Sequence, residues 1–138
     1  MGKKNKNHEC FRVVRSSSGL GLKALRRFKK SEEIIEYTGP RISNEEADER
    51  PNRYLFRLND KYTIDGSPRS NLARYINHSC APNAQAVLSN DERHITIEAI
   101  KRIEEGDEIT YDYGREYFDE YIAPLGCKCV KCQASPEE

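Results

Sequence analysis

Short stretches of alternating hydrophobic and polar residues run through most of this chain, with turn-forming residues between them. Alternation with a period of two is typical of half-buried strands. Asn59-Asp60 and residues 89–92 have the composition of hairpin turns, and each separates two such stretches. The pattern predicts strands at residues 11–15, 33–37, 54–58, 61–64, 84–88, 94–100 and 109–113, with residues 20–25 extended or loop-like. It therefore indicates a mainly β fold.

Two short helical segments complete the pattern. Ser43 followed by Glu46 forms a capping box, so a helix is predicted over residues 44–50 and ends before Pro51. Residues 71–76 are compatible with one or two helical turns. No internal repeat divides the chain, and 138 residues form one domain of ordinary size.

The composition predicts a thin hydrophobic core. Hydrophobic residues make up 36% of the chain and charged residues 33%, tryptophan is absent, and the mean hydropathy is −0.88. Such a domain is expected to gain stability from a metal, a cofactor or a partner. No stretch reaches the roughly 20 apolar residues of a membrane span, and the N-terminus lacks the apolar region of a secretory signal. We therefore expect a reducing intracellular compartment and no membrane partner.

Charge is balanced overall but distributed unevenly. The chain has 23 basic and 23 acidic residues; residues 1–30 contain ten basic residues and one acidic residue, whereas residues 104–138 contain ten acidic and three basic residues. We interpret residues 1–10 as a flexible basic tail. Because nucleic-acid modules are usually net basic as whole domains, no direct nucleic-acid partner is expected. A monomer is the default expectation.

Cysteines cluster at the C-terminus. Cys127, Cys129 and Cys132 are too close together for an ordinary disulfide framework, and clustered thiols in a reducing compartment favour metal binding. Structural zinc takes four tetrahedral ligands, so a fourth must come from elsewhere. Cys80, Cys10 and a histidine are the alternatives.

Three further segments carry candidate chemistry. Gly19-Leu20-Gly21 fits a loose dinucleotide fingerprint, but the βαβ unit which that fingerprint requires is missing, so only a close backbone approach to a ligand is inferred. Residues 74–83 place asparagine, histidine, serine and cysteine side chains within a few positions of one another. Tyr111 and Tyr113 share one side of a predicted strand, and with Tyr37 and Tyr54 they would make an aromatic channel.

In this order, the motifs resemble those of SET-domain protein lysine methyltransferases. The resemblance rests on Gly19-Leu20-Gly21, Tyr37-Thr38-Gly39, Tyr54-Leu55-Phe56, the string from Asn71 to Asn83, and Glu108-Ile109-Thr110-Tyr111-Asp112-Tyr113. Residues 54–80 are most similar to the trithorax-type branch, and the C-terminal cysteines resemble the post-SET zinc motif. The family fold is a β-clip with a C-terminal pseudoknot and a small zinc knuckle. By this resemblance, residues 11–118 form the SET domain and residues 119–138 the post-SET segment and tail.

The resemblance also implies a cofactor, S-adenosylmethionine, and roles for single residues. Tyr113 matches the catalytic tyrosine, and Tyr37 and Tyr111 would line the channel for the substrate lysine. The implied zinc ligands are Cys80, Cys127, Cys129 and Cys132. The implied cofactor contacts are Ser18, Gly19, Leu20, Gly21, Tyr54, Arg74, Asn77, His78, Tyr113 and Lys128.

The chain departs from the family pattern in ways that bear on function. The zinc tail has the spacing C-x-C-x2-C instead of the common C-x-C-x4-C, Leu20 stands where tryptophan or arginine is frequent, and no cysteine-rich pre-SET region precedes residue 11. Tyr111 stands where the family has phenylalanine or tyrosine, and its hydroxyl favours monomethylation.

We expect a protein substrate with an exposed lysine in a basic, histone-like tail. If that substrate is chromatin, the compartment is the nucleus, a nucleoid or a host cell, and otherwise the cytoplasm. The alternative function is a catalytically weak, zinc-stabilised module that binds basic peptides.

Overall fold

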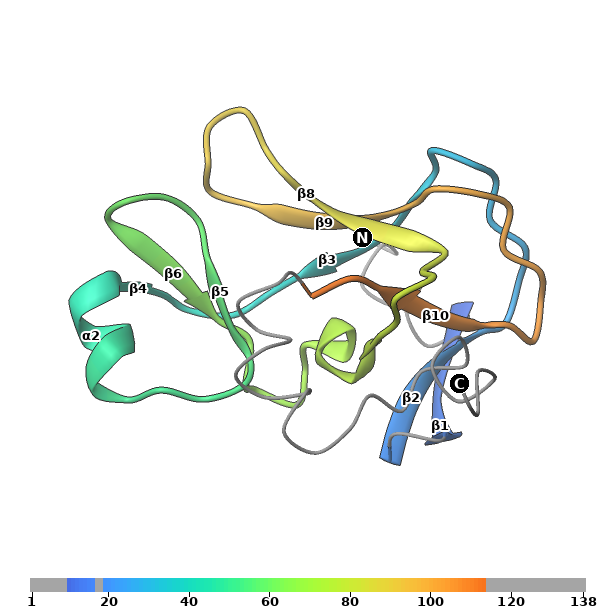
Figure 1. Cartoon of the computed structure of the whole chain (residues 1–138), viewed down its shortest axis with the longest axis horizontal. Helices are drawn as coiled ribbons and strands as arrows, with labels where there is room; N and C mark the ends of the chain where they lie inside the picture. The colour runs from blue at the N-terminus through green and yellow to red at the C-terminus, as the bar shows by residue number, and fades with distance from the viewer. Residues whose placement is uncertain (1–9, 17–18, 114–138) are drawn as a thin grey trace, which may run out of the picture.

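The computed structural model describes residues 10–16 and 19–113, which form two β-sheets with short helices (Figure 1). This confirms the predicted mainly β fold with short helices. The elements in chain order are β1 (Phe11–Ser16), β2 (Gly19–Ala24), β3 (Glu33–Tyr37), β4 (Arg41–Ser43), α2 (Asn44–Glu49), β5 (Leu55–Arg57), β6 (Tyr62–Asp65), the 3-10 helix η2 (Leu72–Tyr75), β7 (Asn77–His78), β8 (Ala84–Leu88), β9 (Ile95–Ala99) and β10 (Glu108–Tyr111). None of the helices in these residues is long and apolar enough to cross a bilayer.

The larger sheet has the strand order β1-β2-β10-β8-β9-β3, and β7 also pairs with β10. Its hairpin β8–β9 is antiparallel, as the sequence predicts. The strands β1 and β2 also pair as an antiparallel hairpin, where the sequence predicts only that residues 20–25 are extended or loop-like. Alternate residues of β9 are buried, which places isoleucines in the core and polar residues outside. The largest fully buried apolar side chains are Phe28, Leu22, Ile76, Ile95, Ile97, Ile103 and Ile109.

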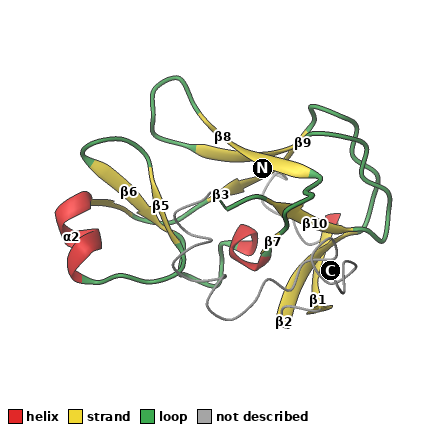
Figure 2. Cartoon of the chain, in the orientation of Figure 1, coloured by secondary structure: helices red, strands yellow, loops and turns green. Residues whose placement is uncertain are grey.

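The smaller sheet, β4-β6-β5, lies with α2 at one end of the molecule (Figures 1 and 2). The hydroxyl of Ser43 accepts the backbone N–H of Glu46 at 3.0 Å, so the predicted cap is present. α2 ends at Glu49, one residue before the predicted end.

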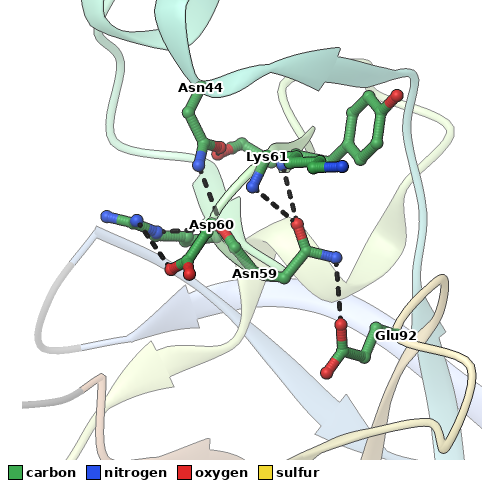
Figure 3. A network of polar contacts seen from close by, with 8 residues as sticks. Asn44, Asn59, Asp60, Lys61 and Glu92 are labelled. Atoms are coloured by element: carbon green, nitrogen blue, oxygen red, sulfur yellow. Dashed lines mark hydrogen bonds and ion pairs between the residues drawn. The ribbon is translucent and has the colours of Figure 1, made fainter.

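The tip of the β5–β6 hairpin is fixed by Asn59 (Figure 3). Its side-chain oxygen accepts the N–H groups of Lys61 and Tyr62, and for this reason the strands end at Arg57 and begin at Tyr62 instead of meeting in a two-residue turn. Its side-chain nitrogen donates to Glu92, 3.2 Å away, on the connection between β8 and β9. The hairpin is thereby tied to the larger sheet.

The central strand β10 joins segments that are distant in sequence. It runs antiparallel to β2 and parallel to both β7 and β8, with Tyr111 paired to His78 on one edge and to Ala84 on the other. The N–H of Ser79 donates to the carbonyl of Tyr111 at 3.1 Å. The Asn-His segment therefore lies directly beside the Tyr-Asp-Tyr segment. β10 ends at Tyr111, not at the predicted residue 113.

Candidate functional site

The residues that the sequence predicts for the site occupy the ends of several elements, some of them paired with β10. Gly19, Leu20 and Gly21 begin β2, Tyr37 ends β3, Tyr54 precedes β5, Arg74 lies in η2, Asn77 and His78 form β7, Cys80 follows it, and Tyr111 and Tyr113 lie at and beyond the end of β10. Ser18, Lys128, Cys127, Cys129 and Cys132 lie outside the described residues.

Asn77 links three strands through its side-chain nitrogen. That atom lies 2.8 Å from the carbonyl of Leu20, 2.9 Å from a carboxylate oxygen of Glu108 and 3.0 Å from the hydroxyl of Ser16. Leu20 contributes its carbonyl while its side chain remains 51% exposed. The glycine loop and the Asn-His segment are thus joined directly.

Gly21 makes this close approach possible. A Cβ at this position would lie 2.5 Å from the carboxylate of Glu108 and 3.1 Å from the side-chain nitrogen of Asn77. A larger residue here would displace these two side chains. The predicted close approach of the glycine pair to a ligand stays a prediction.

His78 is buried and acts as an acceptor. Its Nδ1 accepts the backbone N–H of Tyr113 at 3.1 Å, so the ring proton is assigned to Nε2, which lies 3.5 Å from the Sγ of Cys80. Burial lowers the pKa of His78, and the carboxylate of Asp112, 3.8 Å away, opposes this effect only in part. A neutral imidazole follows.

The two tyrosines of the C-terminal motif pack against each other beside this histidine. The rings of Tyr111 and Tyr113 meet edge to face with centroids 5.0 Å apart, and the Tyr113 ring lies 5.4 Å from that of His78. The hydroxyl of Tyr113 donates to the carbonyl of Ile76. Because the hydroxyl proton of Tyr113 is used in the hydrogen bond to Ile76, the hydroxyl oxygen can still accept a hydrogen bond from another group.

Tyr37 is the third tyrosine of the predicted channel, and it is held from two sides. Its hydroxyl donates to the carbonyl of Tyr54 at 2.8 Å, and its ring packs edge to face on Phe56 at 5.3 Å. A Cβ on Gly66 would lie 2.3 Å from a ring carbon of Tyr37, so this glycine makes room for the ring. Tyr37 is thus fixed through the backbone of Tyr54, and the aromatic channel stays a prediction.

Arg74 has an unsatisfied buried donor. Its guanidinium lies over the ring of Tyr54 at 4.2 Å and over that of Tyr75 at 5.1 Å. Its Nε is the one buried side-chain nitrogen or oxygen among the described residues that has no hydrogen-bond partner. Because an unpaired buried donor is costly, an anionic ligand group is a fitting partner here.

Two asparagines of the segment from Asn71 to Asn83 have structural roles that the sequence did not predict. The fully buried Asn71 accepts the N–H of Thr38 at 3.1 Å and donates to the carbonyl of Gly66 at 3.0 Å. Asn83 accepts the N–H of Thr110 and donates to the carbonyl of Glu108, both at 2.9 Å, and so replaces a strand partner of β10. Their place in the motif was visible, but the backbone groups they satisfy were not.

Of the four predicted zinc ligands, only Cys80 lies in the part of the chain that the structure describes. Cys80 is half-buried, and no group of three or more histidine, cysteine, aspartate or glutamate side chains suited to a metal occurs within residues 10–16 and 19–113. The other three expected ligands lie outside those ranges. The zinc site therefore stays a prediction.

Comparison with known proteins bears on this geometry. The profile of the SET domain matches residues 19–114. Histone-lysine N-methyltransferase 2D of Homo sapiens is 40% identical over 126 residues, covering 83% of this chain and 2% of that protein. Histone-lysine N-methyltransferase trithorax of Drosophila melanogaster is 34% identical over 125 residues, covering 83% and 3%.

A third relative is histone-lysine N-methyltransferase, H3 lysine-4 specific, of Schizosaccharomyces pombe, which is 37% identical over 121 residues, covering 80% of this chain and 13% of that protein. The chain thus spans a small fraction of the relatives it matches. The profile match covers every described element of the site from the glycine pair to Tyr113. On this match, the chain belongs to the SET domain family, within which its similarity extends to trithorax-type proteins.

Proposed function

We propose that this chain transfers a methyl group from S-adenosylmethionine to the ε-amine of lysine in a protein, with a basic histone-like tail as the favoured substrate. The observation that carries the proposal is the position of Tyr113, whose hydroxyl, backbone and ring are all held by neighbouring groups. The names of the relatives support the reaction and the histone substrate. The proposed compartment is therefore the one that contains chromatin.

The cofactor, when bound, supplies an electrophilic methyl group on a sulfonium. We assign its carboxylate end to Tyr54 and to the unsatisfied Nε of Arg74. Asn77 and His78 are assigned to its amino and adenine groups, with further backbone contacts from the segment 18–21 and from Lys128. The neutral state of His78 keeps a second positive charge away from the sulfonium.

We assign Tyr37, Tyr111 and Tyr113 to binding of the substrate lysine. Displacement at the methyl carbon requires the amine to approach in line with the sulfur, so alignment is the first requirement. The oxygen of Tyr113 would accept hydrogen bonds from the amine, because its own proton is donated to Ile76. Tyr37 and Tyr111 would line a dry channel, in which desolvation lowers the pKa of the incoming ammonium and favours the nucleophilic amine.

Two finer features belong to the same proposal. The hydroxyl of Tyr111 would hold a water molecule and leave too little space for a methylated amine, which favours monomethylation. Cys80 would bind structural zinc together with Cys127, Cys129 and Cys132. Its position next to the ring of His78 would connect the zinc knuckle to the cofactor site.

The test is methyl transfer from labelled cofactor to a panel of basic proteins that includes histones, together with direct measurement of cofactor binding. We expect transfer by the native chain, and a loss of at least 100-fold in Tyr113→Phe with cofactor binding retained. Tyr62→Phe is the matched control, because Tyr62 is 43% exposed on the smaller sheet. Cofactor binding without transfer to any protein of the panel would contradict the proposal and favour a peptide-binding module.

A further inference from the structure

The loop between β2 and β3 lies at the end of the molecule opposite α2 (Figure 1). This loop carries a basic hollow. Its volume is about 510 Å³, and it is lined by Arg26, Arg27, Lys29, Lys30, Ser31 and Glu32. Four of these six residues are cationic. The neighbouring loop between β9 and β10 adds Lys101 and Arg102, both exposed.

The two loops are held together by buried residues and backbone hydrogen bonds. Phe28 and Ile103 each donate to the carbonyl of the other at 2.9 Å, and both side chains are buried. The N–H of Ser31 donates to the carbonyl of Ala99 at 2.8 Å. Because Phe28 points inward, Arg27 and Lys29 on either side of it are exposed. The cations of both loops are therefore presented on one fixed surface.

Acidic side chains on this surface neutralise only part of its charge. Glu32 pairs with Arg26 at 2.7 Å. The carboxylate of Glu104 is shared by Arg27 at 3.3 Å and Arg102 at 2.7 Å. In the part of the chain that the structure describes, the ammonium groups of Lys29, Lys30 and Lys101 have no ion-pair partner. These three lysines remain available to an external anion.

The chemistry of the surface favours phosphate over bases. The guanidinium of Arg26 covers the ring of Phe28 at 3.9 Å, and no aromatic side chain lines the hollow. Binding of single strands relies on stacking of bases on exposed aromatic rings, whereas lysine and arginine clusters neutralise backbone phosphates.

The N-terminal segment joins the fold beside this loop. The carbonyl of Cys10 accepts the N–H of Leu25 at 2.7 Å. The residues that line the hollow therefore begin directly after a backbone contact that fixes the start of the loop.

We propose that the basic hollow, together with Lys101 and Arg102, binds the phosphate backbone of duplex DNA. The choice of duplex DNA rests on the proposed histone substrate, which is packaged with DNA, whereas the anion-binding surface itself is independent of methyl transfer. The charge of the whole chain is balanced, and acidic residues also lie on these two loops. Local charge decides phosphate contacts, however, and Lys29, Lys30 and Lys101 have no ion-pair partner among the described residues.

The experiment measures binding of the full chain to a fluorescent 20-base-pair duplex at several salt concentrations, without cofactor. We expect affinity to fall with salt by about 0.9 logarithmic units per decade for each phosphate contacted. The triple variant Lys29→Gln, Lys30→Gln, Lys101→Gln should bind at least tenfold more weakly with a shallower salt slope. Lys61→Gln, which changes an exposed lysine of the β5–β6 hairpin, should bind like the native chain.

A second variant is expected to strengthen DNA binding instead of weakening it. Glu104→Gln removes the carboxylate shared by two guanidiniums and should tighten DNA binding several-fold. Equal losses in the triple variant and in Lys61→Gln, or preferential binding of polyglutamate over DNA, would overturn the proposal. Methyl transfer to a free histone peptide should be unchanged in the triple variant. A failure of methyl transfer is therefore distinguishable from a failure of DNA binding.

Discussion

The backbone N–H of Tyr113 donates to Nδ1 of His78 at 3.1 Å, across 35 positions of sequence. The bond begins where the ladder between β10 and β7 ends, since Tyr111 is the last residue of β10. The side chain of His78 thus provides the next hydrogen bond after the backbone pairing of β7 with β10 ends. The imidazole is held in one tautomer, and the catalytic tyrosine proposed above is held in one place.

Replacing this acceptor tests the relationship directly. His78→Phe keeps a buried ring but leaves the N–H of Tyr113 unpaired, which should cost about 1–3 kcal/mol of unfolding free energy. Urea denaturation measures this change, and cofactor affinity should fall with it. The control is His94→Phe, at an exposed position, with an expected change below about 0.5 kcal/mol. Equal stability of the two variants would contradict the interpretation.

Gly66 is expected to tolerate no side chain. In Gly66→Ala the added methyl would lie 2.3 Å from the ring of Tyr37 and 2.7 Å from the side-chain nitrogen of Asn71, both of which are buried. Overpacking of this kind costs about 1–3 kcal/mol, and displacement of Tyr37 should lower methyl transfer. Thermal unfolding and activity are compared with those of Ser70→Ala, an exposed position nearby. Native activity of Gly66→Ala would argue against a role for Tyr37.

Asp65 gives the fold a defined acid sensitivity. Burial raises the pKa of its carboxyl, but hydrogen bonds from Ser67 and Asn52 outweigh this effect and lower the pKa below its ordinary value. The carboxylate therefore stabilises the fold above the unfolded-state pKa, near pH 4, and this contribution is lost as the pH falls through the lower folded-state value. Asp65→Asn should lose about 1 kcal/mol at pH 7 and converge with the native chain as the pH falls through the lowered folded-state pKa of Asp65. Unfolding free energies at several pH values measure this, with exposed Asp60→Asn as the control.

Tyr111→Phe addresses product specificity. Removing the hydroxyl should free the space of one water molecule and shift the products from monomethyl toward dimethyl and trimethyl lysine. Mass spectrometry of a modified peptide reads the ratio, with Tyr62→Phe as the control. An unchanged ratio in Tyr111→Phe would refute the proposed effect of the hydroxyl.

Zinc should be retained at about one ion per chain and should be needed for a stable C-terminal segment. A chelator is expected to remove it, lower the melting temperature and weaken cofactor binding, since Cys80 lies beside His78. Metal analysis and calorimetry test this. Cys80→Ser should lose zinc, whereas Cys10→Ser should retain it. A fresh preparation without zinc would refute the four-cysteine assignment.

Local pattern determined most of the secondary structure. The hairpin at β8–β9 follows from alternation and turn residues, and α2 follows from the cap at Ser43, because both depend on neighbours in sequence. The resemblance of the ordered motifs to one family also required only the sequence.

Tertiary structure decided which groups meet. The sequence displays Asn71, Asn83 and Arg74 equally as polar members of one motif. In the folded chain, Asn71 hydrogen-bonds to the backbone of Thr38 and Gly66, and Asn83 hydrogen-bonds to the backbone of β10. The Nε of Arg74, by contrast, is buried without a hydrogen-bond partner. These differences depend on pairings between segments distant in the chain, which local pattern does not encode. The same holds for the basic surface, since its two loops meet through contacts between segments distant in sequence, among them the backbone pairing of Phe28 with Ile103.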